Sequence, residues 1–469
     1  MADQHRWDFT GYESNGVTLT PNLDNLARTG ITFKSAYCTA PLCSPSRESI
    51  ASGRYCMSTG CFTNLHELPP GTPTFVGQLR NAGYRTCAVG KTHMEIHAYD
   101  SDLTSKKHRR FMDSLGWDEV CEVSGNGMLK TGIKCAYTQF LRKARKFDDV
   151  LNFYKKWVYF MDKGRAGVPD FTSIEWPFDE HFQEARFVAD RALDWLKNRP
   201  RSEPFFLHVG FPGPHSPIEP FPRFMDLYRN KEEPLPWGVG NCDNALLDAR
   251  RGYRVMISQI DEYVGEICTL LEQQGDLQNT VIVYLSDHGE MAGDLGRIGK
   301  TCFYEASVRV PLLMSGPGIA RGKDSTALVE LIDVGKTICE LCSVEPHALD
   351  QGRNLLPLLH GETEILRDTV YCEMGPDRML CDGRSKLMWG DPGSETRKLG
   401  RIHLDRPVNI PPAPPRLYDL SNDPHELHDL SADPASAGLL HDMKTKLLVR
   451  INENTQMLPF KSRREYKPL

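Results

Sequence analysis

The sequence predicts an α/β fold with a large, mostly parallel sheet and helices on both faces, followed by a small C-terminal α+β domain with an antiparallel sheet. Short apolar runs alternate with helical patterns up to about residue 365, which is typical of parallel sheets. Beyond that point short strands cluster together and one helix closes the chain. The 469 residues, 40% of them hydrophobic, supply enough apolar material for two folded units. We therefore expect domains at 1–365 and 366–469.

The elements of the large domain are predicted from apolar spacing and end signals. Glycine closes the helical patterns at 21–30 and 74–83, as is common at helix C-termini. Segment 184–198 carries Phe187, Ala192, Trp195 and Leu196 on or near one helical face. Short apolar runs bounded by turn residues predict strands. The expected helices are 21–30, 74–83, 184–198 and 254–274, and the expected strands are 84–89, 204–209 and a fully buried 280–285; residues 98–180 show less pattern.

The C-terminal part has a different character. Four short strand patterns occur at 370–374, 378–381, 386–389 and 416–420, and a final helix is expected over roughly 435–453. A proline-rich connector, 407–415, lies among the strands. This order predicts a small antiparallel sheet with one helix.

Composition excludes several classes of protein. The net charge of −6, from 56 basic and 62 acidic residues, lacks the basic footprint of a nucleic-acid binder. Apolar runs are far shorter than the roughly 18 residues of a membrane span. The 14 cysteines show no framework spacing, which favours mostly free thiols, and Cys339 and Cys342 are expected to be core-facing helix residues. No signal peptide is visible, so the protein as written is expected in the cytoplasm.

Polar residues follow several predicted strands at their carboxyl ends, where parallel sheets place their sites. The strand at 280–285 is followed by Asp287 and His288, and the strand at 204–209 by His215. These residues, together with others at strand ends or before a helical pattern, form the candidate site: Asp3, Gln4, Cys43, Arg47, Lys91, His93, His215, Asp287 and His288.

Residues 43–47 read Cys-Ser-Pro-Ser-Arg, which resembles the C-x-P-S-R signature of the type I, formylglycine-dependent sulfatases of the alkaline phosphatase superfamily. The resemblance covers most of the chain, because further segments match the family in order. These are Pro21 to Ala27, Gly53-Arg54-Tyr55, Ala88 to His93, Ser286 to Glu290, Lys300, Tyr304-Glu305 and Leu417 to Glu426.

The resemblance implies an alkaline-phosphatase-like fold and the hydrolysis of a sulfate ester to an alcohol and inorganic sulfate. A separate maturation enzyme would oxidise Cys43 to Cα-formylglycine, whose hydrated aldehyde is the nucleophile. Covalent catalysis of this kind splits one difficult step into two easier ones. The substrate is expected to be a small-molecule or carbohydrate sulfate ester, and assembly into a homo-oligomer stays open.

Residue roles carry over from the family by position. The metal ligands would be Asp3, Gln4, Cys43, Asp287 and His288. Arg47 would hold the formylglycine hydroxyl, Lys91 and Lys300 would bind sulfate oxygens, and His93 would take a proton from the second hydroxyl. His215, with Lys300 as a second donor, would protonate the leaving alcohol, and Asn64 matches a substrate contact. One divalent cation is implied; Ca²⁺ is expected, with Mn²⁺ or Mg²⁺ as alternatives because a histidine ligand departs from the all-oxygen shell of calcium.

Two ligand positions depart from the common sulfatase pattern. Gln4 stands where many sulfatases have aspartate, and His288 stands where many have asparagine. This combination also resembles the phosphonate monoester hydrolases and the choline sulfatases. A phosphonate monoester or phosphodiester hydrolase using the same site is therefore one alternative. An inactive sulfatase-like binding protein is an alternative of another class.

The start of the chain is a further departure. Only Met1 and Ala2 precede Asp3, whereas in the family this aspartate ends a central strand of about six apolar residues. We therefore expect the first strand to be truncated and Asp3 and Gln4 to be poorly held, which weakens metal binding and stability. A periplasmic or secreted location stays open for the same reason.

Overall fold

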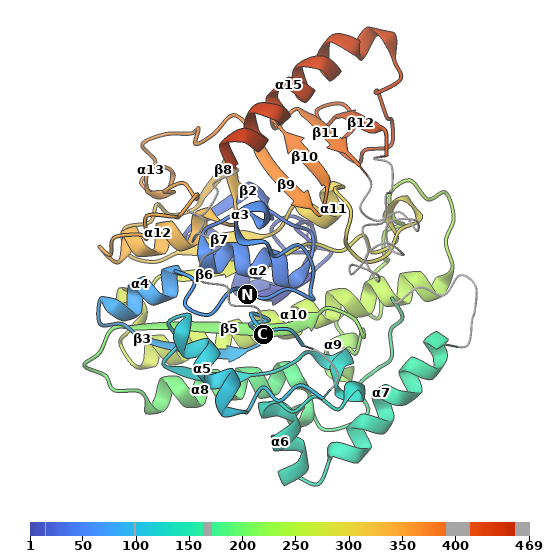
Figure 1. The fold of residues 1–469 in the computed structure, drawn as a ribbon. Coiled ribbons are helices and arrows are strands. Elements are labelled where there is room, and N and C mark those ends of the chain that lie inside the picture. Colours follow the sequence, from blue (N-terminus) through green and yellow to red (C-terminus); the bar gives the residue numbers. More distant parts are fainter. Residues whose placement is uncertain (15, 98–99, 163–170, 391–412, 455–469) are drawn as a thin grey trace, which may run out of the picture.

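The computed structural model describes the whole chain apart from residues 15, 98–99, 163–170, 391–412 and 455–469 (Figure 1). Within the described residues there are three four-stranded sheets. Two of them lie in the large domain, and the third belongs to the C-terminal part of the chain.

The first sheet is wholly parallel and has the order β1 (Ala2–Asp3), β5 (Phe205–Pro214), β3 (Arg85–Gly90), β4 (Glu119–Glu122). The second has the order β6 (Ile282–Leu285), β7 (Leu312–Ser315), β2 (Ile31–Tyr37), β8 (Lys323–Glu330), in which β7 runs antiparallel to both neighbours. A parallel bridge between Ala2 and Ser286 connects the two sheets. The carboxyl ends of β1, β5, β3 and β6 therefore meet near one place.

Helices cover both faces of these sheets, as predicted. On one side α1 (Pro21–Thr29), α8 (Glu184–Asn198) and α10 (Asn244–Gln273) pack together against β5 and β7. On the other side α2 (Cys43–Ser52), α4 (Phe75–Asn81) and α12 (Asp333–Leu341) contact one another and β3 or β8. The remaining helices of the large domain are α3 (Cys56–Thr59), α5 (Lys106–Ser114), α6 (Ala136–Lys143), α7 (Phe147–Asp162), α9 (Pro222–Met225), α11 (Glu305–Val308) and α13 (Leu356–Leu359).

The third sheet is antiparallel and has the order β12 (Pro415–Asp419), β11 (Ser385–Trp389), β10 (Asp377–Cys381), β9 (Val370–Met374), with α15 (Ala437–Asn454) packed on it. Buried charges join this sheet to the large domain. The Lys386 ammonium of β11 lies 2.9 Å from a carboxylate oxygen of Glu305 at the start of α11 and 2.8 Å from one of Glu426. Arg367 forms two 2.6 Å hydrogen bonds to the Asp333 carboxylate.

The predicted elements are present, with some differences in their extent and burial. Helix α10 begins at Asn244 rather than 254, because the Asp243 side chain caps it by accepting from the Ala245 N–H. Strand β6 is only partly buried at Ile282 and Val283, whereas full burial was expected. The interval 98–180 contains α5, β4, α6 and α7, which its sequence pattern did not reveal. Most of the proline-rich connector lies outside the described residues.

The remaining general expectations concern cysteines and membranes. Cysteines such as Cys43, Cys87 and Cys135 form no disulfide in the structure, and Cys339 is fully buried in α12. No described helix combines the length and apolar character needed to cross a membrane.

Candidate active site and metal centre

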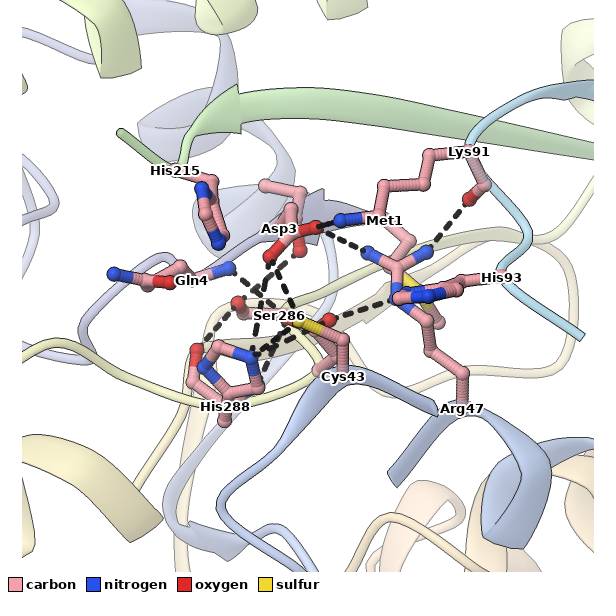
Figure 2. A network of polar contacts seen from close by, with 12 residues as sticks. Met1, Asp3, Gln4, Cys43, Arg47, Lys91, His93, His215, Ser286 and His288 are labelled. Carbon is pink, nitrogen blue, oxygen red and sulfur yellow. Dashed lines mark hydrogen bonds and ion pairs between the residues drawn. The ribbon is translucent and has the colours of Figure 1, made fainter. Parts of the chain in front are cut away.

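Cys43 is the first residue of α2, and its side chain lies at the centre of a buried polar network (Figure 2). The preceding Leu42 is extended, so the helix starts abruptly and leaves its first N–H groups pointing out of the helix end. One of them, the Ser44 N–H, donates to the Asn64 side-chain oxygen at 3.1 Å. Arg47 lies one turn later on the same side of the helix. The signature sequence thus places its cysteine and arginine together because it forms a helix.

Four buried side chains present ligand atoms to one point. They are Asp3 at the end of β1, Cys43, and the pair Asp287 and His288 just beyond β6; one ligand atom from each lies within 4.8 Å of all the others. Cys43 Sγ is 3.2 Å from His288 Nε2 and 3.7 Å from Asp3 Oδ1. All four residues are at most 2% exposed.

This donor set fits a divalent cation. Ligands on opposite sides of a calcium ion are separated by about 4.8 Å, twice the metal–oxygen distance, and the four ligand atoms all lie within that distance of one another. The Nδ1 atom of His288 lies 3.0 Å from the Gly289 carbonyl, so Nδ1 carries the proton and Nε2 is left to bind a metal. Asp287 raises the pKa of His288 although burial lowers it, so a cation must compete with a proton for Nε2.

Three cationic side chains surround the same cluster. Arg47 Nε lies 2.7 Å from Asp287 Oδ2, and its Nη2 lies 3.4 Å from Asp3 Oδ2. Lys91 pairs with Asp3, and Lys300 Nζ lies 3.2 Å from Cys43 Sγ. Burial by itself would raise the pKa of the Cys43 thiol, but the charges of Lys300, Lys91 and His288 lower it well below its ordinary value. A negative charge is therefore stabilised at the position of residue 43.

The two candidate proton carriers lie on different sides of Cys43 (Figure 2). His93 follows β3 with a left-handed backbone (φ 55°), and its N–H donates to Glu122. Burial lowers the pKa of His93, which keeps its imidazole neutral and able to accept a proton. His215 follows β5 and is partly exposed, with Nδ1 2.6 Å from its neighbour's carbonyl at Ser216. This leaves the other ring nitrogen of His215 available for proton transfer.

The sequence also matches the model of a known protein family. The family model described as "Sulfatase" matches residues 1–344. This chain belongs to the sulfatase family. It is thus a hydrolase within the alkaline phosphatase superfamily, as its signature residues predicted.

Relatives and solved structures agree with this assignment. An arylsulfatase of Clostridium perfringens is 27% identical over 475 residues, covering 91% of this sulfatase and 88% of that protein. A choline-sulfatase of Rhizobium meliloti is 29% identical, covering 88% and 78%. The crystal structure of a phosphonate monoester hydrolase of Agrobacterium radiobacter superposes with a TM-score of 0.75 at 21% identity, covering 96% and 94% of the two chains.

The N-terminal residues of the sulfatase are held more firmly than expected. Asp3 is fully buried although β1 has only two residues, because the chain start is bonded to β5: the Met1 ammonium donates to the Val209 carbonyl and the Phe211 N–H donates to the Met1 carbonyl, both at 2.9 Å. Gln4 has a left-handed backbone (φ 68°), and its N–H donates to Asp287 Oδ1 at 2.9 Å. Its amide oxygen accepts from Lys300, which places Gln4 at the edge of the metal cluster.

Some residues at this site carried no predicted role. Glu290 accepts from the Gln4 amide group, and Tyr253 donates to the Gln4 carbonyl. Glu122 accepts from the N–H groups of Thr92 and His93 and so fixes the loop after β3. Glu290 lies within the matched segment at 286–290, which was the only sequence signal for it. Tyr253 and Glu122 gave none, because they come from α10 and β4.

Proposed function

We propose that this sulfatase hydrolyses a sulfate ester to an alcohol and inorganic sulfate, using a formylglycine made from Cys43 and one divalent cation. The observation that carries the proposal is the position of the Cys43 side chain, between a cluster of buried ligands and a lysine ammonium 3.2 Å away. Asp3, Gln4, Asp287 and His288 would hold the cation together with modified residue 43. The cation would polarise a sulfate oxygen and lower the pKa of the attacking hydroxyl, and the hydrated aldehyde would supply two hydroxyls, one to attack sulfur and one to drive release of sulfate.

Sulfate binding and the proton transfers are assigned to side chains of this protein. Lys91, which is buried, and Lys300, which is half-buried, bind the sulfate oxygens, where negative charge builds up. Arg47 holds the hydroxyls of residue 43 and balances the two aspartates. His93 takes the proton from the hydroxyl that remains on residue 43, and His215 gives a proton to the departing alcohol oxygen. The net reaction consumes one water and leaves the aldehyde ready for another cycle.

A second candidate reaction uses the same side chains on phosphorus. The Gln4 and His288 pair favours it, because this combination resembles that of the phosphonate monoester hydrolases as well as that of the choline sulfatases. We propose hydrolysis of phosphonate monoesters or phosphodiesters as the alternative activity of this site.

The deciding experiment compares substrates on one verified preparation. The chain is co-expressed with a formylglycine-generating enzyme, mass spectrometry confirms the aldehyde in the peptide containing residue 43, and turnover of an aryl sulfate and an aryl phosphonate monoester is measured with Ca²⁺, Mn²⁺ and Mg²⁺. We expect the sulfate to have the higher kcat/KM. A higher value for the phosphonate would replace the first proposal by the second.

Matched variants separate chemistry from binding. Cys43→Ala removes the nucleophile and should abolish turnover, whereas Cys242→Ala, at a partly exposed free cysteine, should leave it unchanged. No turnover of either ester by an aldehyde-bearing preparation would identify an inactive binding protein. Full activity of a preparation that carries only the thiol would contradict the formylglycine mechanism.

A further inference from the structure

The end of α2 that lies away from Cys43 carries a buried arginine without a counter-ion. The helix has 10 residues and is followed by Gly53, whose left-handed backbone (φ 61°) ends it; the N–H of Arg54 then donates to the Ser49 carbonyl at 3.2 Å. Arg54 is 3% exposed, yet within the described residues its Nε and Nη2 atoms have no hydrogen-bond partner. Burial lowers the pKa of Arg54, and no carboxylate raises it again. Arg54 lies about 15 Å from Cys43 along the helix axis, outside the catalytic cluster.

A buried guanidinium of this kind needs an explanation. Moving a charge out of water is costly unless the charge is paired, and buried polar groups are normally satisfied by protein, water or a bound ion. Arg47, in the same helix, is buried and pairs with Asp3 and Asp287. The carbonyl groups at the C-terminal end of α2 attract the charge of Arg54 but accept no hydrogen bond from Nε or Nη2. The two free N–H positions of Arg54 are therefore suited to an acceptor from solution.

Two further basic side chains lie close to Arg54. They are Lys336 of α12 and His347 in the loop that follows α12, and both are half-buried. Burial lowers the pKa of His347, the backbone of Ser52 raises it, and the positive charges of Arg54 and Lys336 lower it further, which places the three basic groups together. The two ring nitrogens of His347 are buried and form no hydrogen bond of normal geometry in the described part of the chain. The three side chains thus form a basic cluster.

One acid, Asp350, lies next to this basic cluster but does not neutralise it. Its carboxylate packs against Gly53, where an added Cβ would lie 2.5 Å from it, and accepts from the Gly352 N–H at 2.7 Å. Burial raises the pKa of Asp350 to about 7, although Lys336 lowers it. At neutral pH Asp350 therefore carries only part of a negative charge, whereas Arg54 and Lys336 carry two positive charges.

We propose that Arg54, His347 and Lys336 form a binding site for a free tetrahedral oxyanion such as inorganic sulfate or phosphate. Nε and Nη2 of an arginine form a planar fork that donates two parallel hydrogen bonds to such an ion, and these are the two atoms of Arg54 that lack partners. His347 would donate another hydrogen bond, because a bound anion favours the protonated ring, and Lys336 would add a positive charge. Since Arg54 is only 3% exposed, a small free ion reaches it more readily than the sulfate group of a bulky ester.

The test measures the binding of inorganic sulfate outside the catalytic cluster. Lys300→Ala serves as the background, because it removes a proposed sulfate contact of that cluster. Arg54→Met and Arg54→Lys are compared in this background with Arg109→Met, which changes an exposed arginine of α5. Equilibrium dialysis with radiolabelled sulfate gives the Kd, and phosphate and methyl sulfate are added as competitors. Melting temperatures are recorded in sulfate and in chloride at equal ionic strength.

The Kd for sulfate should rise about 10-fold or more in Arg54→Met, rise less in Arg54→Lys, and stay unchanged in Arg109→Met. Phosphate should compete with sulfate, and methyl sulfate should compete poorly because it carries a single charge. Sulfate should raise the melting temperature of the background protein by about 2–4 °C relative to chloride, and this gain should be absent in Arg54→Met. In chloride Arg54→Met should melt no lower than the background, because it removes an unpaired buried charge.

A purely structural arginine would behave differently. Arg54→Met would then melt lower in chloride and keep its response to sulfate, and this result would overturn the proposal. An equal loss of sulfate affinity in Arg109→Met would overturn it as well, since binding would then reflect overall charge. Competition by methyl sulfate as strong as that by phosphate would contradict the assignment to a free ion. None of these measurements depends on turnover, so they stand apart from the proposed reaction.

Discussion

Replacing Arg47 by methionine tests whether the catalytic cluster is held together by buried charge. The arginine is 1% exposed; its Nε lies 2.7 Å from Asp287, its Nη2 lies 3.4 Å from Asp3, and its Nη1 donates to the Lys91 carbonyl at 2.6 Å. Methionine has a similar length but cannot pair with the two carboxylates. Removing one partner of a buried ion pair costs about 3–5 kcal/mol, so the free energy of unfolding of the metal-free protein should fall by that amount.

The assay is denaturant unfolding in a chelator, with Arg186→Met as the matched control. Arg186 also bonds two carboxylates, those of Asp190 and Glu266, each at 2.6 Å, but its side chain is 20% exposed. A pair of this kind is worth at most about 1 kcal/mol. If Arg47→Met costs no more than Arg186→Met, the buried charge of Arg47 does not hold the cluster together.

Millimolar Ca²⁺ extends the same experiment. A cation that binds only the folded state stabilises it by mass action, and removal of the neighbouring positive charge of Arg47 strengthens its attraction to Asp3 and Asp287. The stability lost in Arg47→Met should therefore be partly recovered on adding Ca²⁺, with a larger gain than in the unaltered chain. An equal or smaller gain would show that Arg47 does not compete electrostatically with the metal.

Three further predictions concern catalysis and pH. Lys91→Ala and Lys300→Ala should each lower kcat by about 10²–10³-fold, while the exposed Lys107→Ala should not change it; steady-state kinetics on the matured enzyme checks this. His215→Ala should slow the hydrolysis of an alkyl sulfate far more than that of a nitrophenyl sulfate, because only the poorer leaving group needs a proton. Equal losses of rate for the two substrates would show that His215 does not protonate the leaving alcohol. Burial raises the pKa of Glu48 from 4.5 to about 9, so folding stability is lost as the pH rises between those values. Glu48→Gln should therefore melt above the unaltered chain in that window but with no difference below it, and parallel melting curves across the range would contradict the assignment.

Local patterns were enough to predict part of the fold, including α1, α4, α8 and α10 and the strands β3, β5 and β6, but not β2 and β8 of the second sheet. Helix α8 occupies the predicted residues 184–198, because its apolar stripe and its ends depend on nearby residues alone. Local patterns did not predict that the strands of the large domain form two four-stranded sheets instead of one large sheet. Which strand pairs with β5, and over how many residues, depends on contacts between segments more than 200 residues apart, such as Ala2 with Phe211.

The sequence also predicted several of the residues that lie together at the candidate site. Asp3, Cys43, Asp287 and His288 do come together, since each follows a strand or opens a helix whose position the fold fixes. His97 was missed, although its ring stacks on His93 at 4.4 Å between centroids. His97 lies in a loop, and no periodic sequence pattern there predicts which residues lie close together in space. The contact between His93 and His97 is therefore visible only in the folded structure.

The buried lysine of the small sheet has a consequence for exchanging parts between relatives. Lys386 pairs with Glu305, only five residues after Lys300, so the segment that carries this proposed catalytic lysine is anchored by the C-terminal part of the chain. A chimera that imports a foreign C-terminal region with an apolar residue in place of Lys386 would leave the buried Glu305 carboxylate paired only with Arg309, 3.6 Å away. Recombination between the large domain and the C-terminal part must therefore keep Lys386, Glu305 and Glu426 together. Otherwise the exchange will disturb the segment that carries Lys300, at a distance from the junction.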